Sequence, residues 1–442
     1  MDLTKGPIVS QILKFAIPLL CSSLVQQLYN TVDLLYVGRF LGKNASAAVG
    51  ASSMMVTCLV GLFGGLSVGA SVVVSRYFGA KDRQQVKNTI HTAAALSLIS
   101  GILIMLIGWA FAPTFIRLIK TPVDIQAEAV TYLRIYFCSI LFVVSYNMAS
   151  GIIRAMGDTR SPLMFQIVGG LTNVVMDAVF IFEFERGVDG VAWATWFSQG
   201  IAAFMAVRYL FKNVDSDIKL FPRDIKIHGD ILKPILKVGI PAGCQTLVIA
   251  LSNVVAQSHI NSLGTDAIAA FTAYFKIELP IYMPIVAVGQ ATTTFVSQNL
   301  GAKQFDRASK GTKTCLLLGL GITIVTSMAM LLIGKYAFGL FYKEASVIET
   351  GLRIIATTFP FYCLYVVLEV FGDAMKGAGK ANVPMTVILA NICVLRSILL
   401  YILVPMYPDV KAVAVTYPVT WFTTALGMVV YYATGKWKTD KL

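Results

Sequence analysis

Two carboxylates, Asp33 and Asp177, stand inside long apolar stretches of the N-terminal half of the chain. If these stretches lie in a membrane, each ionisable group costs at least about 2.5 kcal/mol on insertion scales, so each calls for a reason. Tyr29 and Asn30 precede Asp33 at the spacing of one helical face, and Gln26 extends the same line. The pattern predicts a helix with a polar stripe along an otherwise apolar surface.

Two later stretches carry a similar stripe. Asn173 lies about one helical turn before Asp177, and Thr195 lies about one turn before Gln199. Counted at about 1.5 Å per residue from the outer ends of their stretches, Asp33, Asp177 and Thr195 lie at a similar depth. Carboxylate, amide and hydroxyl oxygens at one level are suited to a hard cation such as sodium. Two neighbouring carboxylates are equally suited to sharing a proton.

We therefore expect one site for a coupling cation, either a proton or sodium. The residues predicted to bind the cation, including a sodium ion, are Asp33, Asn173, Asp177 and Thr195. The residues predicted to line the cavity beside them are Gln26, Tyr29, Asn30 and Gln199. The alternative is that these polar groups only hydrogen-bond one helix to another.

A second set of charged residues lies in apolar stretches of the C-terminal half: Lys276, Glu278, Glu369, Asp373 and Arg396. Their mixed signs favour ion pairs. Counting along the stretches reveals no common depth for them. Two interpretations stay open: structural pairs, or cavity residues that touch cargo or relay protons.

The sequence lacks the patterns that would indicate an enzyme, a cofactor or the use of ATP. The stretch from Gly377 to Ala381 has neither the first glycine nor the final serine or threonine of a phosphate-binding loop. The three histidines and seven cysteines show no metal-binding spacing. A membrane-embedded enzyme would need a clustered nucleophile and base or a metal set, and neither is evident. We expect no enzymatic activity, no cofactor and no ATP.

The elements that must position these residues are membrane-spanning helices. Of the 442 residues, 57% are hydrophobic and 13% are charged, whereas an ordinary soluble domain is about 25% charged. Apolar stretches of about 20 residues recur from end to end. They cover about residues 12–38, 46–75, 88–116, 129–155, 161–183, 190–212, 231–262, 266–298, 309–335, 349–378, 381–404 and 411–434. This predicts an all-α polytopic membrane protein of about twelve helices.

The net charge of +13 is spread over the short segments between these stretches. A nucleic-acid partner is not expected, because such a partner requires basic residues gathered on one folded face. Lysine and arginine concentrate in alternate segments, which predicts that both termini lie in the cytoplasm. We expect a monomer in the cytoplasmic (inner) membrane, whose partners are the lipid bilayer and a small-molecule cargo.

An internal repeat divides the chain. Residues 12–18 (ILKFAIP) recur as residues 235–241 (ILKVGIP), and residues 79–81 (GAK) recur as residues 301–303. Because each half contains an even number of spans, the copies enter the membrane in the same sense and predict two pseudo-symmetric six-helix bundles. The expected domains are an N-terminal lobe at residues 1–212, a cytoplasmic linker at 213–230 and a C-terminal lobe at 231–442.

The repeat does not duplicate the two carboxylates. Val255 or Ala256 matches Asp33, and Leu399 matches Asp177. Groups that only held helices together would more naturally occur in both halves, so the difference favours a functional role.

Prolines mark expected irregularities. Pro18 and Pro241 occupy matching places and are predicted to mark helix starts. Pro280, Pro284 and Pro360 lie further inside their stretches and are predicted to bend or break them.

Short motifs over nearly the whole chain resemble one known family. They are residues 28–33 (LYNTVD) with Val37 and Gly38, the GAK loop and its repeat, Gly157 and Asp158 with Pro162, and residues 173–177. Together they resemble the multidrug and toxic compound extrusion (MATE) transporters. The resemblance implies two six-helix lobes that alternate between outward-facing and inward-facing states. It also implies export of small amphipathic, chiefly cationic, organic compounds in exchange for protons or sodium. The family's cation site matches Asp33, Asn173, Asp177 and Thr195, with Tyr29 beside it.

One departure from the family pattern concerns the C-terminal half. Some members bind a cation through an acidic residue of the seventh span, and residues 231–262 contain none. Glu278, Glu369 or Asp373 could substitute for it. We therefore expect coupling in the N-terminal half.

An alternative function is a flippase of lipid-linked precursors, which would more naturally have extra helices and a strongly cationic cavity. Only Lys276 and Arg396 are basic at membrane depth in the C-terminal half. A channel is a further alternative, but duplicated lobes favour alternating access.

Overall fold

The computed structural model describes residues 1–118, 121–212 and 214–439, with side chains described except at residues 43–44, 51–55, 57–58 and 216. Every regular element in these ranges is helical, and twelve helical segments there are long and apolar enough to cross a membrane. The predicted all-α fold with about twelve spans is therefore confirmed. Residues 213 and 442, which bound two of the predicted domains, lie outside the described residues.

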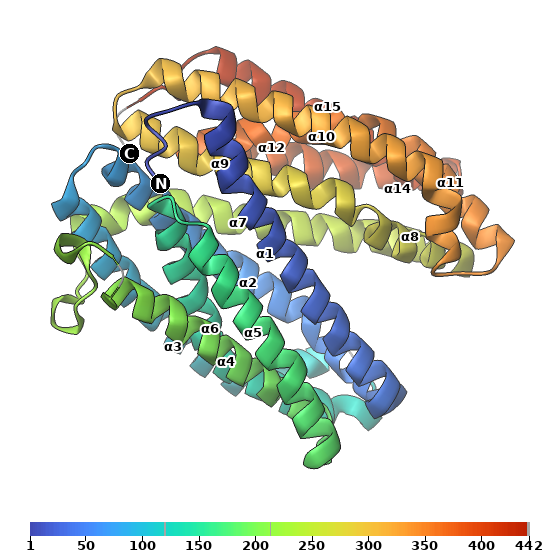
Figure 1. The fold of residues 1–442 in the computed structure, drawn as a ribbon. Coiled ribbons are helices and arrows are strands. Elements are labelled where there is room, and N and C mark those ends of the chain that lie inside the picture. Colours follow the sequence, from blue (N-terminus) through green and yellow to red (C-terminus); the bar gives the residue numbers. More distant parts are fainter. Residues whose placement is uncertain (119–120, 213, 440–442) are drawn as a thin grey trace. The chain divides into compact units, whose positions relative to one another are not determined.

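The described residues form two compact units, of which unit 1 comprises Met1–Asp2 and Ile17–Gly243. Its elements in Figure 1 are most of α1 (Ile8–Tyr36), η1 (Val37–Leu41), α2 (Gly42–Gly79), α3 (Arg83–Leu118), α4 (Val123–Ala155), α5 (Arg160–Ala178), η2 (Val179–Glu183), α6 (Val188–Lys212), η3 (Ser216–Ile218), η4 (Pro222–Asp224) and the beginning of α7 (Gly229–Ser262). Helix α4 is central, because it packs against α2, α3 and α6, while α5 packs against α6. Phe137 and Ile140 of α4 share a buried cluster with Ile104 of α3.

Unit 2 comprises Leu3–Ala16 and Cys244–Leu442. Its further elements are α8 (Thr265–Ile277), α9 (Leu279–Gly301), α10 (Phe305–Gly339), α11 (Ala345–Thr358), η5 (Phe359–Phe361), α12 (Tyr362–Gly377), α13 (Asn382–Ile388), η6 (Leu389–Leu395), α14 (Arg396–Met406) and α15 (Val410–Ala433). Helix α12 is central to this unit, since it packs against α9, α10 and α15.

Two predicted spans of the second half are divided. The eighth, at 266–298, breaks at Glu278 into α8 and α9, and Pro280 lies in the first turn of α9. The tenth, at 349–378, is interrupted by η5, which contains Pro360. Proline is accepted at a helix start, because the backbone N–H there has no intrahelical acceptor. Pro284 lies inside the continuous helix α9, so the break predicted there is absent.

The prediction that Pro18 and Pro241 mark helix starts is wrong. Helix α1 begins at Ile8 and α7 begins at Gly229, so both prolines lie inside helices. Both prolines lie well beyond the first helical turn, which is where proline is preferred at a helix start. Interior prolines are tolerated in membrane helices, because neighbouring groups satisfy the freed backbone carbonyls.

The two halves of the repeat exchange their leading segments. Leu3–Ala16 opens the first half but belongs to unit 2, and the opening of the second half, up to Gly243, belongs to unit 1. Within unit 1, α7 crosses α2 closely: a Cβ on Gly65 would lie 2.3 Å from the backbone nitrogen of Gly243. Only glycine permits this approach. The division at a 213–230 linker stays a prediction.

Candidate functional site

Asp33 and Asp177 come from different helices of unit 1 and face each other. Asp33 lies near the end of α1, and Asp177 is fully buried near the end of α5. Their carboxyl groups lie within hydrogen-bonding range, and Asp33 is also within range of the Asn173 side chain. A carboxylate oxygen can only accept a hydrogen bond. The contact between the two carboxyl groups is therefore a hydrogen bond only when one of them holds a proton.

Four oxygens at this contact are buried and receive no N–H or O–H donor within the described part of the chain: Asp33 Oδ1, Asn173 Oδ1 and both carboxylate oxygens of Asp177. Buried acceptors without a donor are costly, and a bound proton or cation offsets that cost. The all-oxygen set fits sodium. Across the described residues, no group of three or more His, Cys, Asp or Glu could hold a metal. Amide or hydroxyl oxygens would therefore have to complete a sodium site.

A π-helical turn follows each carboxylate directly. Segment η1 begins at Val37, shortly after Asp33, and η2 begins at Val179, shortly after Asp177. The two turns pack against each other, because the rings of Phe40 and Phe182 meet edge to face with centroids 4.9 Å apart. Such π turns are frequent at functional sites. The carboxylates therefore sit where both helices depart from α-helical register.

The side chain of Tyr29, a residue of α1, packs against α5. Its hydroxyl oxygen accepts a hydrogen bond of 3.2 Å from Gln166 Nε2, and Gln199 of α6 also lies within hydrogen-bonding range. Its ring lies over Gly170, where an added Cβ would be 2.9 Å from Tyr29 Cδ1. Because Tyr29 precedes Asp33 by about one turn, this seat also places the phenol near the carboxylate.

The other residues predicted for this site, Thr195, Gln26 and Asn30, lie further from the two carboxylates. The Thr195 hydroxyl donates a 3.1 Å hydrogen bond to the Val191 carbonyl of its own helix, which leaves its oxygen lone pairs available. Within the described residues, the Thr195 hydroxyl forms no hydrogen bond with either carboxylate. Gln26 and Asn30 are exposed on α1. The structure thus brings Asp33, Asn173, Asp177, Tyr29 and Gln199 together, and does not bring Gln26 or Asn30 into that contact.

Two tyrosines of α4 were not anticipated. Tyr132 and Tyr136 lie close enough to interact electrostatically with Asp33, and Tyr132 also with Asp177. Their rings stack with centroids 6.2 Å apart. Their spacing of one helical turn was the sequence feature that could have identified them. Tyrosine is so common in membrane helices that this spacing alone did not single them out.

In unit 2, the break between α8 and α9 places Glu278 beside tyrosines. The Tyr362 hydroxyl donates a hydrogen bond to the Glu278 carboxylate, and Tyr274 lies within hydrogen-bonding range. Arg396 is near enough to Glu278 for electrostatic attraction. Of the residues predicted from the second half, Glu278 and Arg396 therefore share one neighbourhood. Lys276 does not take part, since its side chain is exposed on α8.

Glu369 and Asp373 lie one turn apart on α12, against Gly289 of α9. A Cβ on Gly289 would be 2.5 Å from Asp373 Oδ2 and 3.1 Å from Glu369 Cγ. Asp373 forms a 2.8 Å salt bridge with Lys376, a partner that the sequence analysis did not identify. Both side chains of this pair are largely buried. Mutual neutralisation accounts for the pair, while Glu369 has no salt bridge among the described residues.

Arg396 is buried against aromatic rings. Its guanidinium lies 4.5 Å from the centroid of Tyr417 and donates a 3.1 Å hydrogen bond to Thr420 Oγ1. The ring of Trp421 meets those of Tyr362 and Tyr417 edge to face, with centroids 4.8 Å and 6.0 Å apart. We call the set Tyr282, Tyr362, Tyr365, Tyr417 and Trp421 the aromatic cluster.

Comparison with known proteins identifies the family. Residues 18–179 and 241–402 each match the MatE family. The chain belongs to the MatE family. Members of this family, the multidrug and toxic compound extrusion transporters, are transporters and not enzymes. The two matches also fall in the two halves of the internal repeat, so each half of this MatE chain is one copy of the family unit.

Two relatives align with most of the MatE chain. The probable multidrug resistance protein YpnP of Bacillus subtilis is 29% identical over 449 residues, which cover 100% of this chain and 98% of the relative. The multidrug export protein MepA of Staphylococcus aureus is 23% identical over 382 residues, which cover 86% and 83% of the two chains.

Solved structures share the MatE fold. A MATE protein in its straight conformation has a TM-score of 0.91 at 23% identity and covers 98% of both chains. A MOP superfamily transporter from Pyrococcus furiosus has a TM-score of 0.91 at 24% identity, with 98% and 97% covered. At this identity the likeness establishes the fold.

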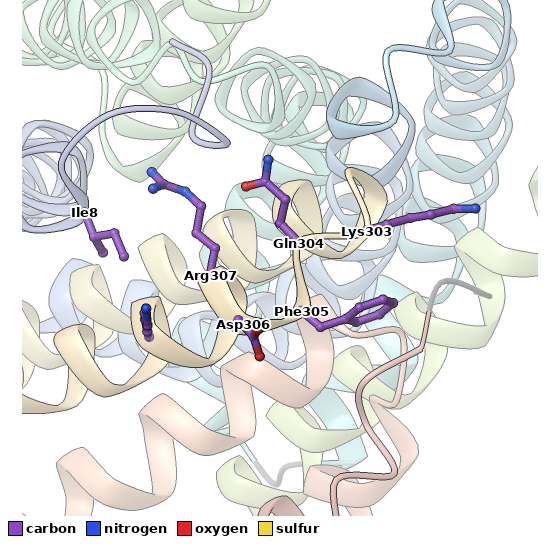
Figure 2. A pocket seen from close by; sticks show the side chains of 7 residues that line it. Ile8, Lys303, Gln304, Phe305, Asp306 and Arg307 are labelled. Atoms are coloured by element: carbon purple, nitrogen blue, oxygen red, sulfur yellow. The ribbon is translucent and has the colours of Figure 1, made fainter.

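A surface pocket of unit 2 lies apart from the predicted residues of this MatE chain. Its volume is about 620 Å³, and it is lined by Ile8, Lys303, Gln304, Phe305, Asp306, Arg307 and Lys310. Figure 2 shows Arg307 pointing toward Ile8, whereas Lys303 points away from Arg307. Arg307 donates 2.9 Å hydrogen bonds to the Gly6 carbonyl and to Gln11 Oε1. Because its cations diverge, the pocket is not an organised anion site.

Proposed function

We propose that this MatE chain is a secondary active transporter that exports small amphipathic, chiefly cationic, organic compounds in exchange for protons or sodium. The cycle is alternating access between outward-facing and inward-facing states. One observation carries the proposal: the carboxyl groups of Asp33, which is half-buried, and Asp177, which is fully buried, face each other without a permanent cationic partner among the described residues.

This arrangement favours binding of positive charge. Two carboxylates in a medium of low dielectric repel each other strongly. A proton removes one charge and converts the contact into a hydrogen bond. Sodium would instead be held by oxygens of Asp33, Asn173 and Asp177, with Thr195 as the candidate hydroxyl ligand. Either ion supports the same cycle.

Coupling requires that the ion bind the two states of the transporter with different affinities. Asp33 belongs to α1 and Asp177 to α5, so a relative movement of these helices changes the separation of the two carboxyl groups. An ion bound between them therefore favours the arrangement in which they are close. Tyr29, held by Gln166 and Gly170, fixes the part of α1 that carries Asp33.

Cargo recognition is assigned to unit 2. Organic cations are bound by apolar burial, by aromatic faces and by a few carboxylates. Glu369 lies near Tyr282 and Tyr365 of the aromatic cluster. We assign Glu278, Glu369 and Arg396 to cargo contact or proton relay, and the neutralised pair of Asp373 and Lys376 to structure. Lys276 receives no role.

The proposed setting is the cytoplasmic (inner) membrane, with both termini in the cytoplasm and a monomer as the working unit. The distribution of lysine and arginine between alternate segments supports this orientation. Neither ATP nor a resident cofactor is part of the proposal.

The experiment is efflux of a fluorescent organic cation from proteoliposomes under separately imposed sodium and proton gradients. The native protein is compared with Asp33→Asn and with Asp124→Asn, in which an exposed carboxylate of α4 is removed. We expect one gradient to drive efflux in the native protein and in Asp124→Asn, and neither gradient to drive it in Asp33→Asn.

Equal gradient-driven efflux in folded Asp33→Asn would remove the N-terminal coupling site from the proposal. Absence of efflux in the native protein under both gradients would favour the alternative of a flippase for lipid-linked precursors. A fluorescent lipid-linked substrate in the same vesicles would then distinguish that alternative.

A further inference from the structure

The segment that joins α6 to α7 is docked on the beginning of α3. Arg83, Lys87 and His91 lie one turn apart on a single face of α3, and each of them contacts this segment. Arg83 forms ion pairs with Asp215 at 3.5 Å and Asp217 at 2.9 Å. This stripe defines a docking surface within unit 1.

The middle of the stripe binds the second half of the segment. Lys87 forms a 2.9 Å ion pair with Asp224 and lies 5.4 Å from the ring centroid of Phe221. The exposed ion pairs are individually weak. The segment is anchored more firmly by the buried side chains of Ile218 and Leu220.

His91 is the buried end of the stripe, with 1% of its surface exposed. Its Nδ1 lies 2.8 Å from the carbonyl oxygen of Lys87, and its Nε2 lies 3.1 Å from the backbone nitrogen of Phe221. The carbonyl can only accept and the Phe221 N–H can only donate. His91 must therefore carry its proton on Nδ1 and present a lone pair at Nε2. Only the neutral ring satisfies both partners.

Protonation of His91 destroys one of these bonds. The imidazolium has an N–H at both nitrogens, so Nε2–H would point at the Phe221 N–H, a donor against a donor. The change also places a positive charge in a buried position close to Lys87. Both effects favour release of the Phe221 backbone from α3.

The neighbouring histidine of the segment does not share this constraint. His228 Nδ1 lies 3.1 Å from Thr92 Oγ1, and the same oxygen accepts a 3.2 Å hydrogen bond from the His228 backbone N–H. A hydroxyl can donate or accept, so it can rotate to suit either form of the ring. Burial, followed by the charges of Lys226 and His91, lowers the pKa of His228.

The other charged groups around His91 come from its own helix and from the docked segment. Arg83 and Lys87 lie on its own helix, and Asp215, Asp217, Asp224 and Lys226 belong to the segment. Lys87 holds the pKa of the Asp224 carboxyl below its usual range. Histidine is the side-chain type on this surface whose ordinary change of charge falls between about pH 5 and pH 8.

We propose that His91 is a pH-dependent clasp, which holds the segment around Phe221 on α3 while its ring is neutral and releases it when the ring is protonated. The buried Ile218 and Leu220 keep the rest of the segment attached, so the change is local. In the proposed orientation this surface lies in the cytoplasm. The clasp would then lower transport when the cytoplasm becomes acidic, a consequence that rests on the proposed function.

Unit 2 provides an internal reference without histidine. The leading segment of the chain is held there through the Leu3 backbone, which donates a 3.0 Å bond to Gln298 Oε1 and accepts a 3.2 Å bond from Asn299 Nδ2. Arg307 adds a 2.9 Å bond to the Gly6 carbonyl. None of these groups titrates near neutrality, so this attachment should not respond to pH in the same range.

The test is hydrogen exchange of the full-length protein in detergent between pH 8 and pH 5.5, expressed as protection factors because intrinsic exchange itself depends on pH. In the native protein, peptides covering residues 219–223 should lose protection by about tenfold on acidification, the loss expected for one buried hydrogen bond. Peptides covering residues 3–7 should not change.

Two variants identify the titrating group. Glutamine can donate and accept but does not titrate, so His91→Gln should keep residues 219–223 protected at every pH. His228→Gln should retain the native pH dependence. A native protein without pH dependence, or equal pH dependence in folded His91→Gln, would overturn the proposal. Loss of the dependence in His228→Gln would also overturn it, even if His91→Gln does not fold.

A transport measurement tests the role of the clasp separately from the proposed function. Dye efflux is measured at a fixed driving gradient while the pH of the cytoplasmic side is lowered. We expect inhibition in the native protein and its relief in His91→Gln. Efflux that responds to pH identically in both proteins would overturn the regulatory role, while the efflux itself would still support the proposed function.

Discussion

The carboxyl group of Asp33 on α1 lies within hydrogen-bonding range of the carboxyl group of Asp177 on α5. The two groups are far apart in the sequence, and the structure buries Asp177 fully and Asp33 partly. Since neither can donate a hydrogen bond when ionised, the pair is stable only with a shared proton or a cation. The pair therefore acts as one binding unit.

A unit of this kind predicts non-additive effects of mutation. Asp33→Asn and Asp177→Asn should each reduce gradient-driven efflux by at least about tenfold, and the double variant should be no worse than either single variant. Initial efflux rates in proteoliposomes provide the measurement. Independent, multiplying losses would show that the two carboxylates do not function together.

The seat of Tyr29 can be disturbed without touching an ionisable group. In Gly170→Ala the new methyl group would meet the Tyr29 ring at 2.9 Å, so the ring must move away from its position near Asp33. We expect slower ion-driven efflux from protein that still folds. Gly200→Ala on α6 is the control, because its methyl group would make only an ordinary contact of 3.7 Å. Equal efflux in both variants would exclude a role for this seat.

Asp158 should make the protein sensitive to acid. It accepts hydrogen bonds from the backbone N–H groups of Arg160 and Ser161, at 3.0 and 3.1 Å, and from the Tyr209 hydroxyl at 2.8 Å. Burial alone would raise its pKa, but the hydrogen bonds from Ser161, Tyr209 and Arg160 lower it on balance. Its contribution to stability is therefore present above its ordinary pKa, and it is lost as the pH falls through the lowered value.

The matching measurement is thermal unfolding in detergent as a function of pH. At neutral pH, Asp158→Asn should lower the free energy of unfolding by about 1 kcal/mol and therefore unfold at a lower temperature. The difference from the native protein should shrink below about pH 4. Asp124→Asn, which removes an exposed carboxylate, should behave like the native protein. A constant difference at all pH values would contradict the assignment.

The buried pair of Asp373 and Lys376 should be sensitive to loss of one partner. Lys376→Met leaves the Asp373 carboxylate without its cation and should destabilise the protein by about 3–5 kcal/mol. Adding Asp373→Asn should recover much of this loss. Arg353→Gln breaks a more exposed ion pair with Asp409 and should cost less than about 1 kcal/mol. Melting temperatures of the four proteins check the series, and similar values for the two single variants would argue against a buried pair.

Much of the architecture could be predicted from local patterns. Twelve apolar stretches predicted the spans, and the internal repeat agrees with the two MatE matches. The sequence also predicted the polar stripe that ends at Asp33 and the similar depth of Asp177. Depth in a membrane can be predicted because it follows from counting residues along one helix. Helix breaks were harder to predict from the sequence, because Pro360 lies at a break whereas Pro284 does not.

The sequence by itself determined that the protein lies in a lipid bilayer, that its fold is helical, and which residues are costly to bury. These properties depend on the composition and hydrophobic periodicity of single segments. Only the tertiary structure decided which of those residues meet. It paired Asp373 with Lys376, added Tyr132 and Tyr136 to the carboxylates, and docked Phe221 on His91. Such contacts depend on how helices rotate and pack against one another, and that information does not reside in the periodicity of any one helix.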